Sequence, residues 1–110
     1  MLACGMAAAQ SRLQPGNPPL NPTNDDLVKL APPERASRLA EAVGNWCIGT
    51  ETFLMGVLTS DPGAGNAYWS LRCADGGTWA VQVDKYGAVT AIDCASYNTV
   101  AVGKECFKKF

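Results

Sequence analysis

Cysteine is the residue type in this chain with the most varied potential chemistry. The five cysteines are Cys4, Cys47, Cys73, Cys94 and Cys106. No two of them form a C-x-x-C pair, and the 110-residue chain contains no histidine. A zinc site, a thioredoxin-like redox motif and catalysis by a Cys-His or Ser-His-Asp system each depend on one of these features. The pattern therefore favours structural disulfides, and we predict no metal site and no cofactor.

The carboxylates are the remaining candidates for catalysis. Glu51 stands alone in a predicted strand without other charges, and Asp93 lies in another strand, where it could share a polar face with Asp84 and Arg72. A small carboxylate enzyme would need two such groups set against each other, whereas a solvated charged face needs no special arrangement. Because no pair is convincingly placed, we predict that the protein is not an enzyme and has no catalytic residues.

Composition and charge argue against two further classes of protein. Nine Lys and Arg residues against ten Asp and Glu residues give a formal charge of −1, without the basic excess typical of nucleic-acid-binding proteins. No run of about 18 apolar residues occurs, so the sequence predicts no membrane-spanning segment. The length of 110 residues and the apolar content of 47% fit one globular domain.

The first nine residues carry the features of an export signal. Residues 1–9 are small and apolar and end in Ala7-Ala8-Ala9, an A-x-A cleavage pattern. We interpret them as a signal-peptide remnant, so that the mature chain begins near Gln10. Cleavage there would remove Cys4 and leave four cysteines, the even number expected for two disulfides in an exported domain. A lipid anchor on Cys4 is the alternative interpretation. Both predict a periplasmic or secreted protein.

Residues 10–32 are rich in proline and asparagine and predict an extended arm. Proline restricts its own backbone and that of the preceding residue, which disfavours regular structure. The arm is either a linker or a segment that lies along a partner in polyproline-like form, with Pro18, Pro19 and Pro22 as its contacts. One helical turn capped by Asn24 is compatible with the same sequence.

The remaining residues, 33–110, predict a single α+β domain. Ala36, Leu39, Ala40 and Val43 repeat at helical spacing, so an amphipathic helix is expected over 33–43, ended by Gly44. Strands with turn signals between them follow. They are expected at residues 46–58, 67–73, 78–84 and 89–94. The prediction is an N-terminal amphipathic helix packed on a four-stranded antiparallel β-meander, with two disulfides and a turn or helix over 95–104.

Side-chain parity predicts a register and, through it, the disulfides. If Leu71 faces the helix, pairing across the two turns sets it against Val81, and Val81 against Ile92. The same register sets Trp79 between Cys73 and Cys94, two strands apart and beyond the reach of a disulfide. Cys47 begins the strand expected beside Cys73, and Cys106 follows Cys94 after a short turn or helix, so the expected bonds are Cys47–Cys73 and Cys94–Cys106 rather than either other connectivity. The opposite face of the sheet is expected to be polar and solvated.

Large aromatic residues outside the predicted core are candidates for partner binding. Tyr68 and Tyr86 are expected to point outward or to lie on a turn, and the chain ends in Phe107-Lys108-Lys109-Phe110. Tyrosine is enriched at interface hot spots, so we predict Tyr68, Tyr86, Phe107 and Phe110 as partner-binding residues. For the tail, packing on the domain's own surface remains an alternative to contact with a partner or an anionic surface.

Four segments carry a resemblance to known sequences. They are Tyr68-Trp69-Ser70-Leu71-Arg72-Cys73-Ala74-Asp75-Gly76, Val81-Gln82-Val83, Asp93-Cys94 and Cys106-Phe107-Lys108-Lys109-Phe110. Over residues 66–110 the chain resembles small exported proteins of alphaproteobacteria, which implies a bacterial, exported and cysteine-bridged protein and no particular activity. The helix followed by a meander also resembles modules of the PepSY type in architecture alone.

These observations favour a non-catalytic exported protein. We expect an accessory or interaction subunit of a larger envelope or membrane-associated complex, whose partner is another protein and not a nucleic acid. A secreted inhibitor or small-ligand-binding module acting alone is the alternative.

Overall fold

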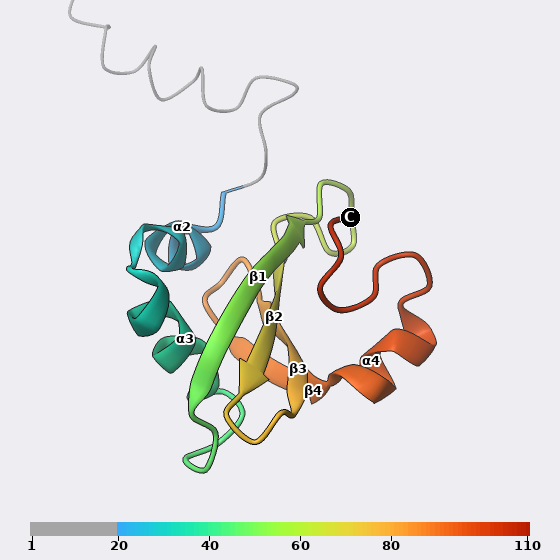
Figure 1. Cartoon of the computed structure of the whole chain (residues 1–110). Helices are drawn as coiled ribbons and strands as arrows, with labels where there is room; N and C mark the ends of the chain where they lie inside the picture. The colour runs from blue at the N-terminus through green and yellow to red at the C-terminus, as the bar shows by residue number, and fades with distance from the viewer. Residues whose placement is uncertain (1–19) are drawn as a thin grey trace, which may run out of the picture.

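The computed structural model describes residues 20–110 (Figure 1). The predicted signal-peptide remnant 1–9, which contains Cys4, and the predicted partner contacts Pro18 and Pro19 lie outside the described residues. Within residues 20–110 the predicted α+β fold with two disulfides is confirmed. Two helices lie on one side of an antiparallel sheet, and a third helix with the C-terminal tail lies on the other.

The sheet is a four-stranded meander in the order β1-β2-β3-β4. Its strands are β1 (Gly49–Val57), β2 (Ala67–Cys73), β3 (Thr78–Val83) and β4 (Val89–Asp93). The helices are α2 (Pro22–Lys29), α3 (Pro32–Ala40) and α4 (Cys94–Val100). Helices α2 and α3 cover one face of the sheet, called here the helix face, and α4 with the tail covers part of the second face (Figure 1).

Helix α3 forms as the apolar repeat predicts. Prolines fill its first turn, where a missing N–H loses no hydrogen bond. The apolar stripe is buried, with Ala36, Leu39 and Ala40 at 3%, 1% and 4% exposure. The helix approaches β1 so closely that a Cβ atom on Gly49 would lie 2.4 Å from the carbonyl oxygen of Ala36. This contact lets Leu39 reach a core that includes Leu71.

The prediction of an extended arm over the proline-rich segment 10–32 is wrong where the structure describes this segment. In place of an extended arm, the described part of this segment is helical over Pro22–Lys29. The side chain of Asn21 caps the helix by accepting a 3.0 Å hydrogen bond from the Asn24 N–H. The many prolines of this segment argue against a helix when the sequence alone is considered. Proline is nevertheless favourable at the first helical position, which Pro22 occupies. Leu27 is 4% exposed and belongs to the core, so α2 is part of the fold.

Two hairpin turns set the register of the sheet. The Cys73 N–H donates to the Gly77 carbonyl at 2.8 Å, and the Asp84 N–H donates to the Ala88 carbonyl at 2.9 Å. Each turn is therefore a three-residue loop. Its last residue is a glycine with φ of 93° or 95°, the left-handed conformation that such loops require.

These short loops shift both predicted pairings. Between β2 and β3 the shift is two residues, so Leu71 lies opposite Trp79 rather than Val81, and the same side chains still face the helices. Between β3 and β4 the shift is one residue, so Val81 lies opposite Ala91 rather than Ile92. A one-residue shift exchanges the two faces of a strand. Ile92 therefore turns to the second face, contrary to the prediction.

The second face of the sheet is covered, where a polar, solvated face was expected. Ser70 and Ala80 on this face are 0% and 3% exposed. The tail lies against β1 and β2, because the Phe107 N–H donates to Ser70 Oγ at 2.7 Å and the Phe110 N–H donates to the Met55 carbonyl at 3.0 Å. The tail thus packs on the domain's own surface and builds a second, smaller core.

Both predicted disulfides are confirmed. Cys47–Cys73 joins the segment before β1 to the end of β2, with the two Cα atoms 5.3 Å apart. Cys94–Cys106 joins the start of α4 to the tail, with a Cα separation of 6.0 Å. The second bond holds the tail beside the face that it covers.

Candidate partner-binding surface

An aromatic cluster lies where the tail crosses the second face of the sheet. We call it the tail-face cluster, and its members are Phe53, Tyr68, Tyr97, Phe107 and Phe110. The ring centroid of Tyr68 lies 6.4 Å from that of Tyr97 and 5.8 Å from that of Phe110. The rings of Phe53 and Phe107 are 6.3 Å apart. Strands β1 and β2, helix α4 and the tail each contribute to the cluster, so its assembly depends on the complete fold.

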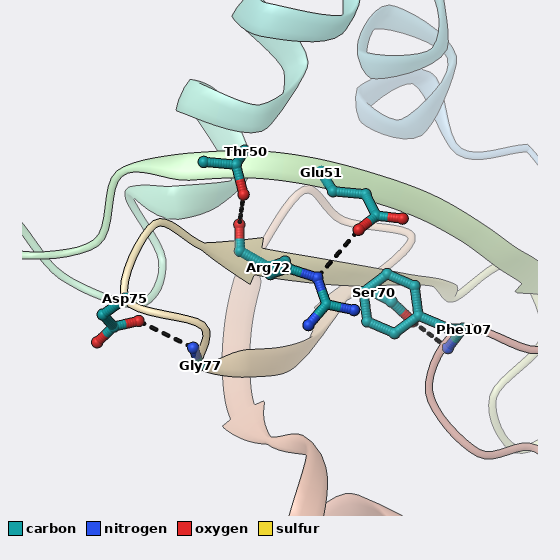
Figure 2. A network of polar contacts seen from close by, with 7 residues as sticks. All are labelled: Thr50, Glu51, Ser70, Arg72, Asp75, Gly77 and Phe107. Atoms are coloured by element: carbon teal, nitrogen blue, oxygen red, sulfur yellow. Dashed lines mark hydrogen bonds and ion pairs between the residues drawn. The ribbon is translucent and has the colours of Figure 1, made fainter.

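Phe107 is fixed by contacts on both its backbone and its ring. Its φ of 62° is left-handed, which is uncommon for a bulky residue, and its N–H is held by Ser70. The guanidinium of Arg72 lies 5.0 Å from the ring centroid. Arg72 also donates from Nε to Glu51 at 3.0 Å. Figure 2 shows Arg72 between the carboxylate of Glu51 and the ring of Phe107.

A second cation lies at the other end of the cluster. Lys104 Nζ is 5.2 Å from the ring centroid of Phe110. Phe110 remains 41% exposed, and Lys104 is exposed as well. The cluster therefore presents aromatic rings with a cation at each end. Aromatic and arginine side chains, though not lysine, are enriched where proteins bind one another.

The two tyrosines of the cluster keep their protons. Burial raises the pKa of Tyr68 and of Tyr97 above the ordinary phenol value. The Tyr68 hydroxyl donates a 2.8 Å hydrogen bond to Gln82 Oε1. Neutral phenols of this kind offer both a hydrogen bond and an apolar ring to a partner.

The structure brings together three of the predicted partner-binding residues and separates two others. Tyr68, Phe107 and Phe110 all belong to the tail-face cluster. Tyr86 lies apart, 85% exposed on the turn between β3 and β4. Pro22 lies in the first turn of α2, on the helix side of the sheet.

Three residues of the surface escaped prediction as partner contacts: Phe53, Tyr97 and Arg72. Tyr97 falls in a segment without clear periodicity, and its place depends on α4, which begins at the Asp93 cap. That cap was legible in the sequence, because Asp93 stands three residues before Ser96 and accepts a 2.9 Å hydrogen bond from its N–H. Phe53 and Arg72 could not be assigned while the second face was taken to be solvated.

The carboxylates considered for catalysis have structural partners. Glu51 pairs with Arg72. The backbone N–H of Ser96 holds the pKa of Asp93 below its usual range, and the N–H of Gly103 does the same for Glu105. Asp84 accepts two backbone hydrogen bonds within its own turn. Within residues 20–110 no group of three or more Cys, His, Asp or Glu side chains is placed to hold a metal ion.

The comparisons with known proteins add no relative. The chain matches no protein family, no curated protein and no solved structure. None of the helices in the described part of the chain is long and apolar enough to span a membrane. Two disulfides are present, a feature typical of proteins that fold in an oxidising compartment.

Proposed function

We propose that this chain is a non-catalytic, exported interaction protein that acts as an accessory subunit of a larger envelope or membrane-associated complex. The observation that carries the proposal is the tail-face cluster. Five aromatic rings and Arg72 are assembled there from four separate segments, and Phe110 is left 41% exposed. Aromatic and arginine anchors of this kind supply most of the energy at protein interfaces.

The electrostatics of the cluster indicate the partner. Lys104, Lys108 and Lys109 lie in the tail around Phe107 and Phe110, and Lys108 is balanced by Glu105 at 3.8 Å. An acidic protein surface with an apolar centre would complement these groups, because rim charges steer association while buried rings hold the complex. We therefore expect the partner to be a protein with an acidic rim.

Charge reversal at Lys104, which lies over the exposed ring of Phe110, tests this function with all five aromatic rings retained. We expect Lys104→Glu to reduce capture of the partner by chemical cross-linking in the native envelope fraction by about tenfold, equivalent to 1.4 kcal/mol. Lys29→Glu, in the last turn of α2 on the helix side, is the matched control and should leave capture unchanged. Equal capture by both variants and the parent would contradict a role for the tail-face cluster.

The proposed location has its own test. The mature protein should begin near Gln10, with Cys47, Cys73, Cys94 and Cys106 all bridged, which non-reducing mass spectrometry of the exported protein would show. An acyl group on Cys4 would support the lipid-anchored alternative. An intact Met1 on the functional protein, or alkylation of any of the four bridged cysteines, would contradict export with cleavage.

A cleft on the helix side favours the small-ligand-binding module as a second candidate. It encloses about 330 Å³ between α2, α3 and the start of β4, within the range of ligand sites. Leu27, Leu39 and Val89 are among its lining residues. Saturable binding of a small apolar ligand, abolished by Val89→Arg, would favour this function over the subunit.

A further inference from the structure

The two edges of the sheet are protected very differently. Strand β1 carries two register irregularities, and α3 packs directly against it. Bulges and a covering helix are the usual means by which proteins blunt an edge strand. Strand β4 pairs with β3 without irregularity and contains neither proline nor a basic residue. Among residues 20–110, no backbone hydrogen bond reaches β4 from its outer side.

The alternation of hydrogen-bonded pairs between β3 and β4 shows which backbone N–H and C=O groups of β4 have no partner in β3. Asp84 and Ala88 form a hydrogen-bonded pair at the turn. Hydrogen-bonded and non-hydrogen-bonded pairs alternate along an antiparallel ladder. The Val83–Val89 and Val81–Ala91 pairs are therefore non-hydrogen-bonded on the β3 side. The N–H and C=O groups of Val89 and Ala91 consequently point outward, in position to bind another strand.

Apolar side chains accompany this open backbone. Val89 and Ile92 are 38% and 43% exposed, and Tyr86 on the preceding turn is 85% exposed. Val89 borders the cleft beneath α2 and α3. On the second face, Ile92 borders a groove of about 250 Å³ with Tyr68 and Tyr97. Side chains of an added strand would alternate between the cleft and the groove, as the pleat of a strand requires.

We propose that this edge binds the β4 strand of a second copy of the chain, antiparallel and centred on Ala91. Opposite charges near the two ends of the strand favour this occupant: Lys85 lies in the turn before β4, and Asp93 ends the strand. Asp84 lies in the same turn, where its carboxylate accepts hydrogen bonds from the N–H groups of Tyr86 and Ala88. Two-fold pairing sets the Lys85 end of each copy against the Asp93 end of the other, twice in one interface. The two Ala91 residues exchange backbone hydrogen bonds, and the four strands of each copy join in one sheet.

The proposed register makes a specific pair of neighbours. With Ala91 opposite Ala91 of the second copy, Thr90 of each copy lies opposite Ile92 of the other, in a non-hydrogen-bonded pair whose side chains are close. Both residues are exposed in the single chain. Charges introduced there act mainly on the interface, because they replace side chains that the fold of one copy leaves in solvent.

Paired charge variants of the full chain test this arrangement. The parent protein should change from the mass of one chain, 11.6 kDa, to twice that value as its concentration rises in sedimentation equilibrium. In T90K/I92K and in T90E/I92E, like charges face each other, and we expect the dimer dissociation constant to rise at least about tenfold. An equimolar mixture of the two should recover the dimer, because lysine then faces glutamate.

Two further variants keep the result decisive. Val89→Pro removes an outward N–H that makes no bond to β3, and it should also prevent the dimer. Thr50→Lys, a charge on the opposite edge strand, is the matched control and should leave the dimer intact. A parent protein that stays monomeric at millimolar concentration, or a mixture of charge variants that stays monomeric, would overturn the proposal. Either result would leave partner capture through Lys104 unaffected, so this proposal and the proposed function fail independently.

Discussion

The indole N–H of Trp69 donates a 2.7 Å hydrogen bond to the side-chain oxygen of Asn24, which joins the centre of the sheet to helix α2. Trp69 is 2% exposed and Asn24 is 5% exposed, so neither group has water as an alternative partner. The guanidinium of Arg35 lies 5.4 Å from the Trp69 ring. Arg35 also donates to three carbonyl groups near the end of α2: those of Leu27, Val28 and Leu30. The helix is thus held at both its ends.

Replacement of Asn24 should show how much its hydrogen bond with Trp69 contributes to the free energy of unfolding. In Asn24→Leu the indole N–H stays buried without an acceptor, and we expect a loss of about 1–3 kcal/mol in the free energy of unfolding. Chemical denaturation followed by tryptophan fluorescence would measure the loss. Asn45→Ala, an exposed position before β1, should change stability by less than about 0.5 kcal/mol. Equal stability of the two variants would show that the bond contributes little.

Removal of α2 should destabilise the domain. A chain that begins at Ala31 loses Leu27 from the core and leaves Trp69 exposed on the helix side. Burial of a leucine side chain alone is worth about 1.5–3 kcal/mol, so we expect a clearly lower thermal midpoint than for a chain that begins at Leu20. Calorimetry of the two truncated proteins makes the comparison. The same midpoint for both would return α2 to the role of a separable arm.

Arg35 offers a more local test of the same attachment. Arg35→Met keeps most of the apolar stem but removes the donors that bind the carbonyl groups at the end of α2. We expect a loss of about 1–3 kcal/mol, with faster amide exchange in α2 than in α3. Arg38→Met, an exposed arginine one turn further along, is the control. Unchanged exchange in α2 would contradict the role given to Arg35.

The helix and strand positions could be predicted from the sequence, whereas the pairing of the strands could not. Periodicity located α3 and the four strands, because side chains such as Leu39 and Leu71 must share one buried face. The predicted register was wrong at both hairpin turns, since loop length is ambiguous until Gly76 and Gly87 are assigned to the left-handed position, and only the one-residue error at the β3–β4 turn exchanged the faces of a strand.

The candidate surface was less predictable than the sheet. Tyr68, Phe107 and Phe110 were identified by residue type, but their meeting depends on a tail without periodicity. Its path is fixed by the Cys94–Cys106 bond and by single hydrogen bonds such as that of Phe107 to Ser70. Contacts between residues so distant in sequence leave no local pattern to detect.

Acid should loosen α4 and the tail. Hydrogen bonds from Ser96 and Gly103 lower the pKa of Asp93 and of Glu105 in the folded protein. A folded-state pKa below the unfolded one adds stability that is fully present above the ordinary carboxyl pKa of about 4 and is lost as the pH falls below it. The thermal midpoint should therefore drop between pH 6 and pH 3, and drop less in Asp93→Asn. Asp61→Asn, in an exposed loop, should behave like the parent. Equal acid sensitivity in all three would contradict this assignment.

The Cys94–Cys106 bond should control the tail without controlling the sheet. The double variant Cys94→Ala, Cys106→Ala removes the bond, whose cysteines are 12 residues apart in sequence. In the chain-entropy model a disulfide that closes a loop of this length stabilises the folded protein by about 3 kcal/mol. Phe107 and Phe110 each have only one backbone hydrogen bond to the sheet side, so their amides should lose exchange protection first. Amides at the centre of β2 and β3 should stay protected, because the helix-face core and Cys47–Cys73 remain. The same variant should lose partner capture, since the tail-face cluster no longer assembles. Tail amides that keep full protection in the variant would show that the aromatic contacts hold the tail without the disulfide.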